Sequence, residues 1–112
     1  ADFRISPEVV EFVLAQNRRL LISHPVRHPD HFIGAFFGDA QISLQHLLRI
    51  LEKIDEGVTE LMVHPGLCDG ALRATSGYNW QREQELNVLC DLAVRERLTE
   101  LGIVLANYGI LA

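Results

Sequence analysis

Blocks of apolar and polar positions along the chain predict helices, strands and loops in turn. A cap serine, Ser6, followed by proline and glutamate predicts a helix start, and the apolar positions extend that helix to about residue 21. Two prolines in the histidine-rich stretch 23–31 remove backbone donors, so a loop is expected there. Residues 32–37 are apolar on both faces, which predicts a strand covered on two sides.

The middle of the chain predicts another helix and another strand. Ser43 is the expected cap of an amphipathic helix whose apolar residues recur every three or four positions as far as Ile54. Gly57 stands where it could end that helix. Residues 58–63 predict a second buried strand, and residues 65–78 predict a long loop.

Two capped helices and a third strand are expected in the last part of the chain. Asn79 and Asp91 are the predicted N-caps of consecutive helices, and Gly102 is the predicted end of the second. Cys90, at the end of the first of these helices, is expected to be a small core residue. The apolar run 103–106 predicts the third strand.

This order predicts a single α/β unit over residues 1–112, with βαβαβ connections and a parallel sheet. Three strands are few for such a sheet, and the outer ones would leave unpaired edges. The chain is therefore expected to be a small α/β domain, an intertwined oligomer or part of a larger protein. The last of these is the favoured interpretation.

Composition and charge narrow the function classes. The chain is 48% hydrophobic and 22% charged with a net charge of −5, and its basic residues are scattered, which argues against nucleic-acid or anionic-membrane partners. It has no apolar run of the ~20 residues that span a bilayer and no signal-peptide pattern at its start. Two cysteines are too few for a disulfide framework, so a cytoplasmic location is expected.

His64 is the first candidate for chemistry. It follows the second predicted strand and precedes Pro65-Gly66, so its ring is expected at the carboxyl end of the sheet. Histidine titrates near neutral pH and can give or take a proton in catalysis. The alternative is a structural histidine that bonds to the neighbouring loop, and position alone leaves the two open.

The histidines at positions 24, 28 and 31 suggest a metal site less strongly. Two rings four residues apart bind a metal well on a helix, but Pro25 and Pro29 forbid that helix. A solvated loop is therefore favoured for these residues. His46 is expected on the exposed side of the helix that follows Ser43.

The second candidate stretch is residues 76–86. Tyr78, Trp80 and Arg82 lie where a loop enters a helix, at the same end of the sheet as His64. A phenol, an indole and a guanidinium can stack on a sugar or orient a carboxylate. The alternative is helix packing, with Arg82 and Glu85 as surface charges, and it remains open.

These motifs together resemble the YdjC-like carbohydrate deacetylase family. The resemblance rests on PDHF at 29–32, GVTELMVHPG at 57–66, SGYNWQREQEL at 76–86 and DLAVRERL at 91–98. It covers roughly residues 24–108 and leaves residues 1–22 unmatched. It implies the C-terminal portion of an incomplete (β/α) barrel in a hydrolase that deacetylates N-acetylated amino sugars or oligosaccharides.

The resemblance also implies roles for individual residues. His64 would protonate the leaving amine or stabilise the oxyanion, and Tyr78, Arg82 and His31 would contribute to the substrate site. The family uses a divalent metal, Mg²⁺ or Zn²⁺, held by an Asp-Asp motif and histidines of the first half of the barrel. This chain contains neither motif, so the metal ligands are expected elsewhere and the chain alone is expected to be inactive.

A different class of function is kept as the alternative. Unpaired strand edges could make the chain a non-catalytic α/β module that forms homo-oligomers or binds a partner protein. An Asp-Asp motif upstream of Ala1 in the same gene would favour the enzyme. A reading frame that starts near Ala1 would favour the binding module.

Overall fold

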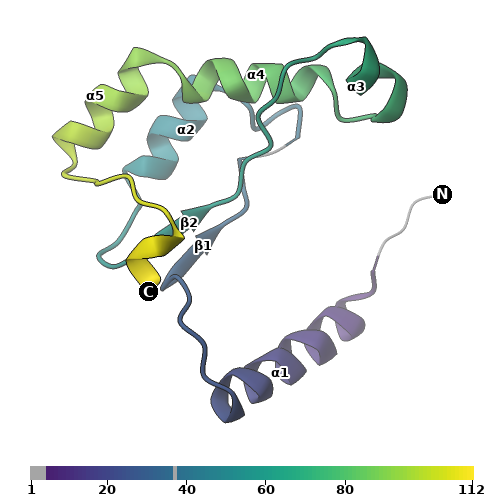
Figure 1. Ribbon diagram of the computed structural model, residues 1–112, viewed down its shortest axis with the longest axis vertical. Helices are drawn as coiled ribbons and strands as arrows, with labels where there is room; N and C mark the ends of the chain where they lie inside the picture. Colours follow the sequence, from purple (N-terminus) through teal and green to yellow (C-terminus); the bar gives the residue numbers. More distant parts are fainter. Residues whose placement is uncertain (1–4, 37) are drawn as a thin grey trace. The chain divides into compact units, whose positions relative to one another are not determined.

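A computed structural model describes residues 5–36 and 38–112 of the chain (Figure 1). It forms two compact units, residues 1–28 with Leu111–Ala112, and Pro29–Ile110. The helices are α1 (Pro7–Ser23), α2 (Leu44–Leu51), α3 (Gly70–Thr75), α4 (Trp80–Leu89), α5 (Leu92–Glu100) and the 3-10 helix η1 (Tyr108–Leu111), and the strands are β1 (His31–Ile33) and β2 (Thr59–Leu61). Among the described residues, no helix combines the length and the apolar character needed to cross a membrane.

Helix α1 makes up most of the first unit and begins as predicted. The Ser6 hydroxyl accepts the backbone N–H of Val9 at 3.4 Å, with Pro7 in the first turn. Backbone hydrogen bonding, then the Ser6 side chain, lowers the pKa of Glu8 in that turn. No side chain of α1 is buried, and the exposed apolar ones are Val9, Val10, Phe12, Val13, Leu14, Leu20, Leu21 and Ile22.

The two strands of the second unit pair in parallel, with Phe32 opposite Glu60. Helix α2 connects them, so the predicted α/β class with a parallel βαβ unit is confirmed. Both strands are shorter than predicted, although the Met62 N–H continues the ladder to the Ile33 carbonyl at 2.9 Å. Position 37, the last of the first predicted strand, lies outside the described residues.

The third predicted strand is not formed. Residues 103–107 follow α5 without strand pairing, and Val104 and Leu105 are 85% and 79% exposed. An apolar run becomes a strand only where a neighbouring edge accepts its hydrogen bonds. Within the described part of the chain, the sheet has only β1 and β2.

Two smaller expectations for the second unit are also wrong. Helix α2 ends at Leu51 with Glu52 as its C-cap, so Gly57 does not terminate it. Gly57 instead adopts a φ of 101° just before β2, where the chain turns into the sheet. The predicted loop 65–78 contains α3, which the Asp69 side chain caps by accepting the Leu72 N–H at 2.8 Å.

The core lies where α2 packs against α4 and α5, which run one after the other alongside it (Figure 1). Its buried apolar residues come from α2, from α5 and from the segment between β1 and α2, and they are Phe36, Ile42, Leu47, Ile50, Leu51 and Val94. Cys90 is exposed, contrary to expectation, because it is the C-cap of α4 rather than a residue of its inner face. Both cysteines are free thiols.

The predicted caps of the last two helices are confirmed. Asn79 accepts the Trp80 N–H at 2.6 Å, and Asp91 accepts the Ala93 N–H at 2.9 Å. Gly102, at φ 68°, ends α5 while the Ile103 N–H returns to the Leu98 carbonyl at 2.9 Å. This pattern is a Schellman motif, which satisfies carbonyls that the helix end leaves without partners.

Candidate functional site

His64 lies just beyond the carboxyl end of β2, separated from Leu61 by Met62 and Val63. The turn that follows it is held against α4, because the Gly66 N–H donates to the Arg82 carbonyl at 3.1 Å. A Cβ at position 66 would lie 3.7 Å from Arg82 side-chain carbons, which is ordinary contact distance. The sheet end and helix α4 therefore meet at His64.

Glu85 joins these two elements from inside the protein. Its side chain is completely buried, and one carboxylate oxygen, Oε2, accepts the His64 backbone N–H at 2.5 Å. The other oxygen accepts the phenol hydrogen of Tyr78. A buried carboxylate is tolerated only where hydrogen bonds replace its hydration, and these two donors do so.

Tyr78 extends the same network to the segment after β1. Its hydroxyl oxygen accepts the Gly38 N–H at 3.2 Å, and its ring meets the His64 ring edge to face with centroids 5.9 Å apart. Burial, and then the hydrogen bond to Glu85, raises the pKa of the Tyr78 phenol. The phenol therefore stays protonated through the neutral range.

Arg82 lies over the ring of Tyr78. Its guanidinium carbon is 5.6 Å from the Tyr78 ring centroid, and its Nε donates to the Tyr78 carbonyl at 3.0 Å. No residue of the described chain accepts a hydrogen bond or forms an ion pair with its terminal nitrogens. That pair of donors is suited to an oxyanion or to a sugar hydroxyl.

Two side-chain amides of α4 hold the segment between β1 and α2. Gln81, which is buried, donates to the Asp39 carboxylate at 2.9 Å, and Gln84 donates to the Ile42 carbonyl at 2.7 Å. Together with the bond from Gly38 to Tyr78, they fix this segment beside the network. The site thus draws on both strand ends and on α4.

The predicted site residues separate into two places. The structure brings His64, Tyr78 and Arg82 together, as the sequence predicted for one end of the sheet. His31 begins β1 and is therefore at the opposite end, where its Nε2 lies 3.2 Å from the Glu56 carbonyl. Its role in substrate binding stays a prediction, and the geometry does not add it to the His64 site.

Other residues are not where the sequence placed them. His46 is half-buried rather than exposed, since its ring stacks on Phe36 and its Nε2 lies 3.3 Å from the Ala35 carbonyl. Trp80 is exposed, and its indole N–H has no hydrogen-bond partner among the described residues. Glu85 is buried, so the alternative that made it a surface charge is wrong for this residue.

Glu85 and Gln81 are the site residues that sequence reasoning missed. Both lie on the face of α4 that also carries Val88 and Leu89, which pack on the core. A spacing of four between Gln81 and Glu85, continued by apolar residues three and four positions later, is the pattern that could have found them. Because both side chains are polar, the sequence did not mark them as part of the buried face of the helix.

The described residues do not themselves fit a metal ion. Nowhere in residues 5–36 and 38–112 do three His, Cys, Asp or Glu side chains form a group that could hold one. Stable divalent-metal sites in proteins need about three or more such ligands.

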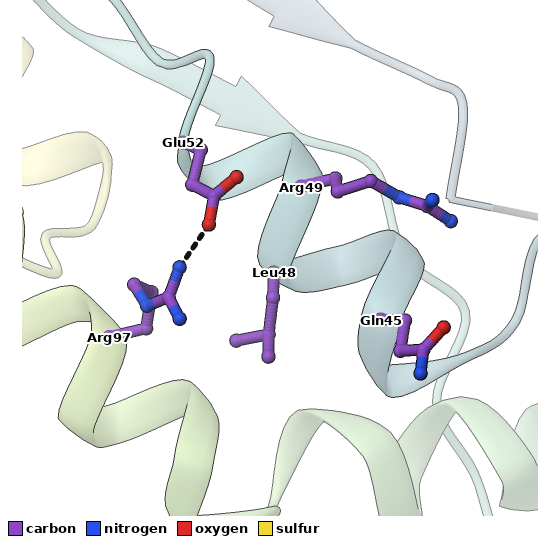
Figure 2. Close-up of a pocket in the computed structure, with 5 residues that line it drawn as sticks. All are labelled: Gln45, Leu48, Arg49, Glu52 and Arg97. Atoms are coloured by element: carbon purple, nitrogen blue, oxygen red, sulfur yellow. Dashed lines mark hydrogen bonds and ion pairs between the residues drawn. The ribbon is translucent and has the colours of Figure 1, made fainter.

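An open groove lies elsewhere, between α2 and α5. Figure 2 shows its lining residues, Gln45, Leu48, Arg49, Glu52 and Arg97. Leu48 faces the opening, and the ion pair of Arg97 with Glu52 bridges the two helices (Figure 2). The groove shares no lining residue with the His64 network, so its polar groups are assigned to the contact between the helices.

Comparison with known proteins identifies the relatives of this chain. The profile of the YdjC-like protein family matches residues 4–100. A carbohydrate deacetylase of Thermoanaerobacter pseudethanolicus is 35% identical over 95 residues, covering 85% of this chain and 38% of that protein. A chitooligosaccharide deacetylase of Yersinia enterocolitica is 32% identical over 98 residues, covering 85% of this chain and 38% of that protein.

The fold has a solved counterpart. A crystal structure of an Enterococcus faecalis protein named for cellobiose-phosphate cleavage superposes with a TM-score of 0.73 at 32% sequence identity. The superposition covers 97% of this chain and 40% of that one. The chain therefore spans less than half the length of each of these proteins.

Proposed function

The chain belongs to the YdjC-like protein family, and on that premise we propose that it is part of a hydrolase that removes acetyl groups from N-acetylated amino sugars. Relatives named carbohydrate deacetylase and chitooligosaccharide deacetylase support this substrate class. Because those proteins are more than twice as long as the matched region, the active enzyme would include further residues. The predicted barrel, cytoplasmic location and inactivity of the chain alone belong to this proposal.

The observation that carries the proposal is the arrangement around His64. Its backbone is fixed by a buried carboxylate, while its ring faces a neutral phenol beside an arginine with two available nitrogens. Hydrogen bonds of this kind fix the main chain from which a catalytic ring projects. A histidine with a purely structural role would not require these hydrogen bonds.

The chemistry assigned to these residues is acid assistance. Attack of water on the acetamide carbonyl gives a tetrahedral oxyanion, and collapse of that intermediate expels the amine with acetate as the second product. A protonated His64 stabilises the oxyanion and gives its proton to the departing amine nitrogen. Arg82 orients a hydroxyl or oxyanion of the substrate, and Tyr78 holds Arg82 in place.

The divalent metal of the proposed enzyme would be bound outside this chain. The described residues lack a set of ligands for it, and Lewis-acid activation of water is the chemistry such a metal supplies. The choice between Mg²⁺ and Zn²⁺ would follow from those other ligands. Within this chain, the residues position the substrate and transfer the proton.

Acetate release by the full-length protein that contains this chain tests the proposal. We expect His64→Gln to lower kcat for an N-acetylated chitooligosaccharide about 100-fold or more, since general acid catalysis contributes about 10²–10⁴-fold. His46→Gln is the matched control, because His46 lies on α2 and outside the network. Equal rates for the two variants, with the fold intact by circular dichroism, would make His64 structural.

A second candidate function rests on the exposed apolar surface. Helix α1 buries no side chain, and Phe32 on β1 is 62% exposed. Such surfaces mark association sites, so the alternative proposal is a binding module that forms homo-oligomers. Sedimentation of the chain distinguishes the proposals, because a monomer at micromolar concentration would contradict a self-associating module.

A further inference from the structure

We propose that Glu85 is the positioning residue of the site, fixing the His64 main chain and the Tyr78 phenol through its two carboxylate oxygens. Glu85 is completely buried and receives one donor on each oxygen. The effect of Glu85 on turnover rests on the proposed function. The effect of Glu85 on the position of His64 is independent of that function.

The two donors come from different parts of the fold. The His64 N–H belongs to the segment that leaves β2, and the Tyr78 hydroxyl belongs to the loop that enters α4. The hydroxyl oxygen in turn accepts the Gly38 N–H from the segment after β1. One buried side chain thereby sets the separation of three segments that are distant in sequence.

The bond to His64 is made by its backbone rather than by its ring. The peptide group is held at 2.5 Å from the carboxylate, so the position from which the ring projects is fixed. The ring then packs edge to face against the same phenol that Glu85 binds. Displacing the carboxylate would therefore shift the imidazole in two ways. It would release the His64 main chain, and it would move the Tyr78 ring against which the imidazole packs.

Only a carboxylate satisfies this arrangement. An amide of the same shape has one oxygen, so its nitrogen would face either the His64 N–H or the Tyr78 hydroxyl. The Tyr78 hydroxyl oxygen already accepts the Gly38 N–H. If this oxygen also accepted a hydrogen from the amide nitrogen, the hydroxyl hydrogen of Tyr78 would lose its present acceptor. Glu85→Gln is consequently a sharp test that keeps side-chain volume.

Glu83 provides the matched control. It lies on the same helix and also accepts a backbone N–H, that of Cys68 at 3.3 Å, but within the described chain it forms no hydrogen bond with His64 or Tyr78. Glu83→Gln removes the same charge from α4. A difference between the two variants is therefore due to the network and not to helix charge.

The first measurement is the His64 backbone amide proton shift of the chain by NMR. A short bond to a carboxylate moves this proton downfield, so we expect an upfield shift in Glu85→Gln and none in Glu83→Gln.

The second measurement is acetate release by the full-length protein, where we expect Glu85→Gln to lower kcat about tenfold or more with KM changed less than about twofold. Glu83→Gln should leave both constants unchanged.

An unchanged His64 amide shift in Glu85→Gln would overturn the proposal, and so would a moved shift with unchanged kcat in an active enzyme. If the wild-type protein releases no acetate, the proposed function fails, while the amide shift still decides whether Glu85 positions His64. If Glu85→Gln does not fold, Tyr78→Phe replaces it. Removing the phenol donor concentrates the carboxylate charge on the His64 N–H, so a further downfield shift supports the proposal and an unchanged one overturns it.

Discussion

Gly57 lies so close to Asp30 that a Cβ at position 57 would be 2.6 Å from the Asp30 carboxylate oxygen Oδ2. That same oxygen accepts the Val58 N–H at 2.8 Å, and the Asp30 N–H donates to the Val58 carbonyl. The pairing of β1 with β2 is therefore fixed at its start by one carboxylate and one glycine. Any side chain at position 57 would displace the Asp30 carboxylate and weaken its hydrogen bond to the Val58 N–H.

We expect Gly57→Ala to destabilise the chain by about 1–3 kcal/mol, because alanine is strained at positive φ and its methyl group would displace Asp30. Chemical denaturation monitored by circular dichroism measures the change. Gly70→Ala is the control, since nothing lies within 4 Å of its Cβ position and it begins α3. Similar losses at the two positions would contradict the steric argument.

Tyr78 should make stability fall at alkaline pH. Burial, then the bond to Glu85, raises its folded pKa, so its contribution is complete below the unfolded tyrosine pKa of about 10 and is lost as pH rises through the folded value. Denaturation midpoints between pH 8 and pH 11 should decline more steeply in wild type than in Tyr78→Phe.

Tyr108 supplies a comparison for that experiment. Its pKa is also raised, first by a hydrogen bond to Glu60, but the residue is 64% exposed. The chain has only two tyrosines, so each single phenylalanine variant leaves one phenol to follow by ultraviolet absorbance. An ordinary pKa for Tyr78 in Tyr108→Phe would contradict its burial.

Leu47 is the position where truncation should cost most in α2. It is 1% exposed within the core, and leucine-to-alanine changes at such sites typically destabilise by about 2–5 kcal/mol. Leu67→Ala, at a side chain 72% exposed, should change stability by no more than about 0.5 kcal/mol. Comparable denaturation midpoints for the two variants would place Leu47 outside the core.

Arg82→Lys should weaken substrate binding in the full-length protein. Lysine keeps the charge but loses the Nε bond to the Tyr78 carbonyl and the planar pair of terminal donors, so KM is expected to rise about tenfold with a smaller change in kcat. Arg95→Lys, at an exposed site on α5, is the control. An unchanged KM would remove Arg82 from the substrate site.

The local features of this fold were predictable because they depend on neighbouring residues. Ser43, Asn79 and Asp91 cap their helices as expected, since each cap bond spans no more than three residues. Gly102 ends α5 for the same local reason. These positions required no knowledge of the tertiary structure.

The remaining features depend on distant partners. Residues 103–106 have the composition of a strand, but within the described chain no edge pairs with them. Glu85 has the composition of a surface charge, yet its partners are His64 and Tyr78, which only the fold brings to it. The sequence therefore predicted that His64, Tyr78 and Arg82 lie at one end of the sheet, and it missed Glu85, which joins His64 to Tyr78.

The amides of Gln81 and Gln84 hold the segment after β1 to α4, and this has a consequence for how the protein opens. Hydrogen-exchange protection follows cooperative units rather than sequence order. The Gly38 amide, although it follows the sheet in sequence, should exchange together with the amides of α4, because its acceptor Tyr78 and the neighbouring side-chain bonds are lost only when that helix unfolds. The segment between β1 and α2 thus belongs dynamically to α4, to which it is joined by hydrogen bonds that span 40 and 42 residues of sequence.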